Sequence, residues 1–190
     1  MDIQENKRLF RKKISSLKEK YPTEYITQRS DKITQRIAEN PLFLQAETVA
    51  IYHALPDEVQ TAGFIEKWHL KKKILLPVVE DKDISLQLYK GKESLKAGCF
   101  GILEPDCTEK GIKPDLIIVP GIAFDHQCNR LGRGKGYYDR LLSDTSVPTI
   151  GICFHFQLFD QIPTDVHDQK MSIIITDQEI IMNKEISLSE

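Results

Sequence analysis

Residues 116–142 read LIIVPGIAFDHQCNRLGRGKGYYDRLL, and this stretch decides which fold the chain adopts. It opens with the apolar run 116–119, which Pro120 and Gly121 close, and such a pattern predicts a buried strand that ends in a turn. It finishes with apolar residues at helical spacing over 137–142, so we expect a helix there. A strand, a glycine-rich loop and a helix therefore follow one another in the chain.

The loop between the strand and the helix interleaves cations with glycines. Its members are Arg130, Gly132, Arg133, Gly134, Lys135 and Gly136. Glycine lets a backbone approach a ligand closely, and the N-terminus of a helix offers N–H groups and a positive dipole end to an anion. The spacing matches neither the Walker loop nor the dinucleotide fingerprint. We interpret the loop as a phosphate site, with a surface loop of solvated charges as the alternative.

Length and composition limit the kind of protein. A chain of 190 residues is long enough for one domain, 1–190, with a substantial core. A net charge of -2 is typical of an ordinary globular protein and does not suggest a nucleic-acid partner. The first ten residues contain no signal-peptide pattern, and no apolar run approaches the roughly 18 residues of a membrane span. We expect a cytoplasmic monomer that binds neither nucleic acid nor membrane.

The four cysteines show no zinc-binding spacing, and we expect free thiols in a reducing compartment. They are Cys99, Cys107, Cys128 and Cys153.

The rest of the chain alternates between strand-like and helix-like segments. Apolar periodicity predicts helices over about 4–21 and 24–39, a third through 64–69 that is capped at Asp57 or Thr61, and a short helix over 157–161. Apolar runs and alternation predict strands near 48–52, 74–79, 84–89, 148–154 and 171–176, with 179–181 as a hairpin partner of the last. Residues 91–115, rich in glycine and proline, read as a long connection. This order predicts an α/β fold, with a layered, mostly parallel sheet and helices on both faces.

Cations and one carboxylate elsewhere in the chain are candidates for the same site. Lys7, Arg11 and Lys18 lie along one edge of the first predicted helix, and the alternative is that they only extend beside its apolar face into solvent. Glu58 follows the strand 48–52, where open parallel sheets hold their ligands. A solvated glutamate at a helix start is its alternative.

Two aspartates could hold a magnesium ion beside bound phosphates. Mg²⁺ takes one or two carboxylates and fills its other positions with water and phosphate oxygens. Asp139 lies near the start of the helix after the loop, and Asp168 precedes the last long strand. A favourable interaction with the helix dipole and a turn carboxylate are the respective alternatives. No serine or cysteine has the setting of a nucleophile, which favours phosphoryl transfer over covalent catalysis.

These motifs together resemble the 5-formyltetrahydrofolate cyclo-ligase family, also called methenyltetrahydrofolate synthetases. GIAFDHQCNRLGRGKGYYDRLL at 121–142 is similar to the signature of the family, and KRLFR at 7–11 to its K-x-x-L-R segment. DEVQT at 57–61 and residues 163–176 are similar to two further segments, in the same order. Phe10 replaces the usual leucine, Cys128 stands where glycine is common, and His53 occupies a position that relatives fill with apolar residues.

The resemblance implies a fold of the kind shared by ribose-phosphate isomerases and CoA transferases. It implies that ATP and Mg²⁺ support the cyclisation of 5-formyltetrahydrofolate to 5,10-methenyltetrahydrofolate, with release of ADP and phosphate. By the same resemblance, Arg133 and Lys135 are catalytic and Asp139 and Asp168 bind the metal.

The implied ATP-binding residues are Lys7, Arg8, Leu9, Phe10, Arg11, Arg130, Leu131, Gly132, Arg133, Gly134, Lys135, Gly136, Tyr137 and Tyr138. The implied substrate-binding residues are His53, Glu58, Arg133, Gly134, Lys135, Gly136 and Tyr137. Two other functions stay open from the residues alone. One is a module that holds a nucleotide or folate, or binds RNA, without turnover. The other is a nucleotide-dependent kinase of a small metabolite.

Overall fold

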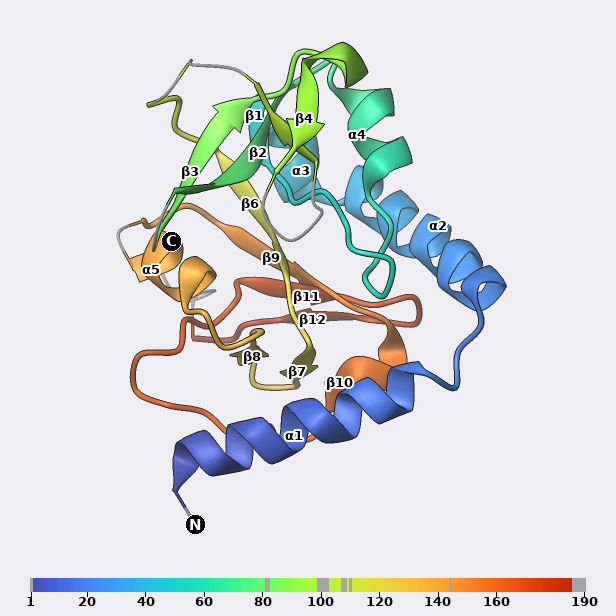
Figure 1. Cartoon of the computed structure of the whole chain (residues 1–190), viewed down its shortest axis with the longest axis vertical. Coiled ribbons are helices and arrows are strands. Elements are labelled where there is room, and N and C mark those ends of the chain that lie inside the picture. Colours follow the sequence, from blue (N-terminus) through green and yellow to red (C-terminus); the bar gives the residue numbers. More distant parts are fainter. Residues whose placement is uncertain are drawn as a thin grey trace.

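A seven-stranded sheet forms the centre of the computed structural model, which describes residues 2–80, 83–98, 103–106, 109, 111–143 and 145–185 (Figure 1). In spatial order the strands are β12 (Ile180–Met182), β11 (Ile173–Ile175), β9 (Thr149–Ile152), β6 (Leu116–Pro120), β1 (Thr48–Ala50), β2 (Lys73–Glu80) and β3 (Asp83–Leu88). The five inner strands are parallel, and both outer strands run antiparallel to their neighbours. The predicted mostly parallel sheet is thus confirmed.

Successive residues of the buried strands point to opposite faces of the sheet, and each face carries its own helices. On one face, strand residues such as Val49 and Ile118 pack with α2 (Thr23–Glu39), α3 (Pro41–Gln45) and α4 (Ala62–Trp68). On the other face, Ile117 and its neighbours pack with Leu142 of α5 (Tyr137–Ser143). Helices on both faces were expected and are confirmed.

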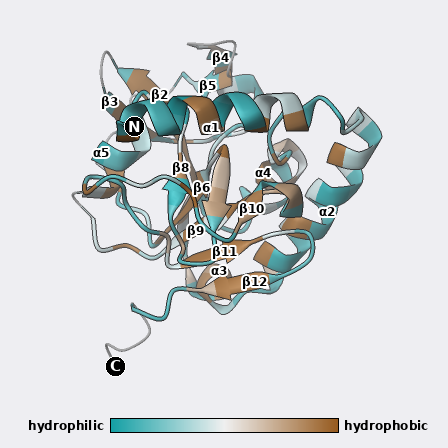
Figure 2. Ribbon diagram, turned by 90° about the horizontal axis from the view of Figure 1, so that it is seen from below, coloured by the Kyte–Doolittle hydropathy of each residue, from teal (hydrophilic) through white to brown (hydrophobic). Residues whose placement is uncertain are grey.

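The helix α1 (Ile3–Lys18) packs against a second, small sheet made of β10 (Leu158–Phe159), β7 (Ala123–Asp125) and β8 (Arg130–Leu131). Ile14 of α1 is fully buried and lies in one cluster with Leu131. Figure 1 shows α1 across the lower side of the molecule, and the colours of Figure 2 show that hydrophilic and hydrophobic residues recur along this helix. The small sheet therefore places α1 next to the segment that follows β6.

Three short elements differ from the prediction. Residues 157–161 do not form a helix, because a 3₁₀ turn, η3 (His155–Gln157), leads into β10, which pairs with β7. The expected connection 91–115 contains η1 (Lys92–Ser94) and the antiparallel pair β4 (Leu95–Ala97) and β5 (Leu103–Pro105). The hairpin β7–β8 also separates β6 from the glycine loop. Strands of two or three residues are too short to leave a periodic signal, and β10 also depends on a partner far away in the sequence.

The turn between β7 and β8 is held by Asp125, a buried residue that bonds the backbone around it. Its Oδ1 accepts from the N–H groups of Gln127 and Asn129, each at 3.0 Å. Cys128 lies inside this turn with a φ of 63°, a conformation that glycine adopts without strain. Cys128 and Cys153 are free and buried, whereas Cys99 and Cys107 lie outside the described residues. Burial raises the pKa of Cys128 to about 11.

Within the described ranges, no helix has the length and apolar character needed to cross a membrane.

Candidate active site

A cavity of about 320 Å³ opens at the carboxyl ends of β1 and β6. The glycine loop, which we define as residues 132–136, lines one side of it. The remaining lining residues are Tyr52, His53, Leu55, Glu58, Pro77, Val79, Ile84, Glu104, Pro120, Gly121, Arg130, Tyr137, Tyr138 and Asp139. The structure therefore brings together the predicted loop, the helix that follows it and the two residues expected to contact the substrate, His53 and Glu58.

The backbone of the glycine loop needs its glycines at two positions. Gly134 has a φ of 94° and Gly136 a φ of 70°, values that residues with a side chain rarely adopt. The carbonyl of Gly132 accepts a hydrogen bond from Nε of Arg11 at 2.8 Å, which joins α1 to the loop. Because α5 is only seven residues long, the side-chain cations must supply most of the positive charge here.

Arg133 reaches across the mouth of the cavity to two carboxylates of the segment after β1. Its Nη2 lies 2.9 Å from Oδ1 of Asp57 and 2.9 Å from Oε1 of Glu58. The Glu58 side chain is only 11% exposed, and its Oε2 accepts from the N–H of Leu55 at 3.0 Å. The solvated glutamate considered for position 58 is thus wrong, because the side chain is buried and fixed on both oxygens.

Lys18 secures the same segment from α1. Its Nζ donates to the carbonyl and to Oδ2 of Asp57, both at 2.9 Å. Burial alone would raise the pKa of Asp57, but the hydrogen bonds and charges of Lys18 and Arg133 outweigh it and hold the pKa below its usual value. Asp57 therefore links α1 to the glycine loop through its ion pairs with Lys18 and Arg133.

Arg130 lies beneath the loop and is almost fully buried. Its Nη2 donates to Oδ1 of Asp139 at 2.5 Å, and its guanidinium lies 5.6 Å from the ring centre of Tyr138. Its Nε is buried and has no hydrogen-bond partner among the described residues. Burial, with a smaller contribution from the charge of Glu58, raises the pKa of Tyr138, so its hydroxyl stays neutral. Arg130 thus holds the start of α5 in place and keeps one donor unused.

Arg11 places a further cation of α1 beside the loop, and Lys7, one helical turn earlier, pairs with Asp168. Nζ of Lys7 lies 2.7 and 2.6 Å from the two oxygens of Asp168, and the Lys7 side chain is 6% exposed. Burial lowers the pKa of Arg11, although the charges of Asp168 and Asp139 oppose the shift. The alternative in which these cations only extend into solvent is therefore wrong for Lys7, which ends on a carboxylate.

Other members of the predicted ATP-binding set lie outside the cavity lining. Arg8 is exposed and pairs with Glu5 at 2.7 Å, and Leu9 is 43% exposed. Phe10 packs edge-on against Phe159 with ring centres 5.0 Å apart. Leu131 is buried in the cluster beneath α1. These four side chains do not line the cavity. They could therefore contact a ligand there only through backbone atoms or after a conformational change.

The donor chemistry of Asp139 and Asp168 fits a magnesium ion that is completed by phosphate oxygens and water. Both carboxylates already bind a cation, Asp139 through Arg130 and Asp168 through Lys7. Oδ2 of Asp139 receives no hydrogen bond from the described part of the chain. Within that part, no three His, Cys, Asp or Glu side chains form a group able to hold a metal by themselves. The two aspartates could therefore hold Mg²⁺ only together with ligand oxygens.

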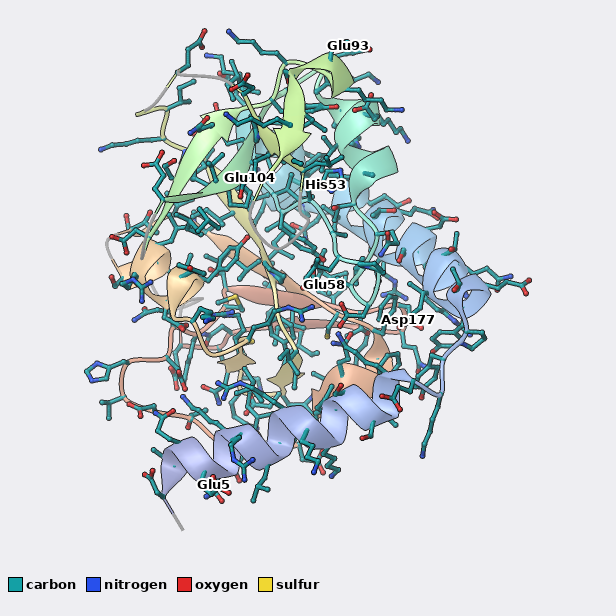
Figure 3. All side chains as sticks on the ribbon, in the orientation of Figure 1. Glu5, His53, Glu58, Glu93, Glu104 and Asp177 are labelled. Carbon is teal, nitrogen blue, oxygen red and sulfur yellow. The ribbon has the colours of Figure 1, made fainter. Side chains whose placement is uncertain are left out.

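Several cavity residues had not been identified from the sequence. Tyr52, whose hydroxyl donates to the carbonyl of Val59 at 3.1 Å, closes the cavity beside His53. Pro77, Val79 and Ile84 supply an apolar wall from β2 and β3. Glu104 of β5 is buried and lines the same cavity, and its side chain is labelled in Figure 3. The alternation in residues 84–89 predicted a half-buried strand, but nothing indicated that it would face a ligand.

The fold and the site together define a class: an α/β enzyme whose cavity, at the ends of parallel strands, joins an apolar wall to a cation-rich loop suited to an organic phosphate. Residues 3–177 match the model of the 5-formyltetrahydrofolate cyclo-ligase family. The chain belongs to this family of enzymes, as the motifs at 7–11, 57–61 and 121–142 predicted.

Individual relatives agree with this assignment. A protein of Schizosaccharomyces pombe named as a probable 5-formyltetrahydrofolate cyclo-ligase is 31% identical over 180 residues, which cover 83% of this chain and 88% of the relative. The 5-formyltetrahydrofolate cyclo-ligase of Haemophilus influenzae is 33% identical over 65% of this chain and 72% of its own. The solved structure of Aquifex aeolicus 5,10-methenyltetrahydrofolate synthetase has a TM-score of 0.86 at 32% identity, over 94% of this chain and 93% of that one.

Proposed function

We propose that this protein uses ATP and Mg²⁺ to cyclise 5-formyltetrahydrofolate to 5,10-methenyltetrahydrofolate, with release of ADP and phosphate. The observation that carries the proposal is the cavity itself, in which an apolar wall lies opposite the glycine loop and Arg133 of that loop pairs with Glu58. A flat pterin suits the wall, and a triphosphate suits the loop. Family membership supports the same reaction.

In this proposal the triphosphate of ATP lies along residues 130–138, with Lys7 and Arg11 beside it. Arg133 and Arg130 are held by carboxylates at present, so the incoming phosphates compete with Glu58 and Asp139 for them. The Nε of Arg130 is buried and has no hydrogen-bond partner among the described residues. In this proposal it donates a hydrogen bond to a phosphate oxygen. Lys135, which makes no ion pair within the described residues, is available without such an exchange.

The proposed chemistry has two steps. The formyl oxygen attacks the γ-phosphorus of ATP and ADP leaves, so that the formyl carbon carries a phosphate ester. The N10 amine then attacks that carbon, closes the ring and displaces phosphate, and the N10 proton is lost. Arg133 and Lys135 neutralise the charge of the transferred phosphoryl group, a role for preorganised cations that needs no covalent intermediate with the protein.

Asp139 and Asp168 are the residues proposed to hold Mg²⁺, which when bound neutralises phosphate charge. Glu58 and His53 are proposed to contact the folate. Burial lowers the pKa of His53, with Glu66 opposing the shift, so the imidazole is neutral at pH 7 and can act as a hydrogen-bond donor or acceptor.

Three further expectations belong to the same proposal. The sheet is expected to be of the kind shared by ribose-phosphate isomerases and CoA transferases. The protein is expected to act as a monomer in the cytoplasm. Analytical ultracentrifugation of the purified protein tests the monomer, and a sedimentation coefficient of a dimer would contradict it.

Purified protein mixed with 5-formyltetrahydrofolate, ATP and Mg²⁺ tests the function, with methenyl absorbance and ADP followed in parallel. We expect one ADP for each methenyl product, and no product when EDTA removes the metal. Folate binding without product would favour the binding module, and ADP formation that depends on a non-folate acceptor would favour the kinase. Either result would reject the proposal.

A further inference from the structure

Glu104 occupies an unusual position for a carboxylate. It lies on β5, is 5% exposed and lines the cavity on the side of β2. Its Oε1 accepts a single long hydrogen bond, 3.3 Å from the N–H of Val79. Oε2 has no hydrogen-bond partner in the described part of the chain. Buried carboxylates usually accept several hydrogen bonds, so most of the hydrogen-bonding capacity of Glu104 is left unfilled by the described residues.

The other carboxylates of the cavity are neutralised, and Glu104 is not. Glu58 pairs with Arg133 and Asp139 pairs with Arg130. No cation among the described residues forms an ion pair with Glu104, and its strand neighbour Lys96 bonds Asp106 at 2.6 Å instead. The cavity is therefore polarised, with cations at the glycine loop and, at the β2–β5 end, an acceptor that makes no ion pair within the described residues and has only the more distant charge of Lys96 to oppose its own.

The backbone around Glu104 leaves room for its carboxyl group. A β-carbon on Gly98, at the other side of the β4–β5 pair, would overlap the Glu104 carboxyl carbon and oxygen. Figure 3 shows Glu104 and His53 on the side of β2 and β4, away from Glu58, which lies closer to the small sheet. The carboxylate is thus held at the end of the cavity opposite the cations.

We infer that Glu104 recognises the amino-pyrimidinone edge of the pterin ring and so determines the specificity of the site. That edge carries a 2-amino group and an adjacent ring N–H, two parallel donors that match the two oxygens of a carboxylate. The apolar residues Pro77, Val79 and Ile84 exclude water around the pair, which strengthens it. This inference rests on the proposed function, because it takes a reduced folate as the ligand.

The variant Glu104→Gln tests the inference, with Glu93→Gln as its matched control. The amide keeps the shape of the side chain but turns a donor toward the donors of the pterin. We expect the KM for 5-formyltetrahydrofolate to rise roughly 10- to 100-fold, with the KM for ATP within about twofold of its original value. Glu93 lies exposed on η1, just before β4, and its replacement should change neither constant.

A substrate analogue with a methyl group in place of the 2-amino group gives a test that does not depend on the folding of a variant. The unaltered protein should bind it roughly tenfold more weakly than 5-formyltetrahydrofolate, whereas Glu104→Gln should discriminate less than about threefold. Equal binding of both compounds by the unaltered protein would overturn the inference, as would full discrimination by Glu104→Gln.

The proposed reaction and the proposed role of Glu104 can be rejected independently of each other. Absence of methenyl product with the unaltered protein rejects the proposed reaction, and calorimetric titration of the two folates still decides the role of Glu104. Normal turnover with an unchanged folate KM in Glu104→Gln rejects the role of Glu104 and leaves the reaction intact. If the unaltered protein neither turns over nor binds 5-formyltetrahydrofolate, both are rejected.

Discussion

The two ends of the cavity differ in how their charged side chains are paired. At the loop end, Arg130 and Arg133 are each paired with a carboxylate before a ligand arrives. At the β2–β5 end, Glu104 is buried and has no cation partner among the described residues. An anion that binds Arg130 or Arg133 must therefore displace a carboxylate, whereas the donors of a ligand at the other end meet an acceptor that is already in place. We conclude that the loop end depends on an exchange of ion pairs and the β2–β5 end on preorganisation.

Replacing Lys135 should give the largest effect, because it is the loop cation that needs no such exchange. We expect Lys135→Ala to lower kcat roughly 10²- to 10³-fold, the usual loss when one preorganised donor is removed, without a change in the circular dichroism spectrum. Lys113→Ala, at an exposed site before β6, is the control. A near-normal kcat in Lys135→Ala would mean that the loop is not the site of phosphoryl transfer.

The ion pairs at the loop end should also contribute to stability, and α1 offers a matched comparison. Lys7→Met leaves Asp168 without its buried partner and should cost about 3 kcal/mol of unfolding free energy, or roughly 6–12 °C in Tm. Arg8→Met removes an exposed pair on the next residue of the helix and should leave the Tm unchanged. Equal shifts in the two variants would show that the burial of Lys7 does not matter.

The conformation of the glycine loop gives a smaller effect. Gly134→Ala forces a side chain into a φ of 94° and places its β-carbon 3.3 Å from the guanidinium carbon of Arg11. We expect a loss of about 1–2 kcal/mol in urea unfolding and a higher KM for ATP. In Gly63→Ala, on α4, the added carbon meets nothing within 4 Å, and stability should rise by up to about 1 kcal/mol. Equal signs in the two variants would contradict a strained loop.

The smallest effect concerns pH at the β2–β5 side of the cavity, where His53 is half-buried. Burial lowers the pKa of His53 below 6.5 in the folded protein, so the unfolded chain binds the proton more readily. The free energy of unfolding should therefore fall as the pH drops from 6.5 to the folded-state pKa. Urea titrations between pH 7.5 and 5 should show a shallower decline for His53→Gln. An identical pH dependence of the two proteins would show that His53 is not desolvated.

The long elements of the fold and the position of the glycine loop could be predicted from the sequence, because their signals are local. The apolar stripe of residues 4–21 sufficed for α1, and the run 116–119 sufficed for β6. β10 and the β4–β5 pair could not be predicted in this way. Each strand has only two or three residues, too few for a periodic signal. β10 also depends on β7, more than thirty residues earlier in the chain, whereas β4 and β5 pair with each other.

The candidate site likewise contains residues that the sequence identified and residues that it did not. Glu58, Asp139 and the loop cations were identified from motifs. The ion pairs between them form only in the folded protein, so their spacing in the sequence does not predict these pairs. Glu104 left no signal, because a glutamate in a glycine- and proline-rich connection is usually solvated. Only the packing of β5 against β2 turns it into a buried acceptor.

A crystal structure with a non-hydrolysable ATP analogue and 5-formyltetrahydrofolate tests the central claim most directly, because it shows both ends of the cavity at once. We predict the triphosphate beside residues 130–138, with Arg133 turned from Glu58 toward the γ-phosphate, and the pterin between the apolar wall and Glu104. A triphosphate bound away from residues 130–138, or a pterin stacked on the glycine loop, would contradict the account.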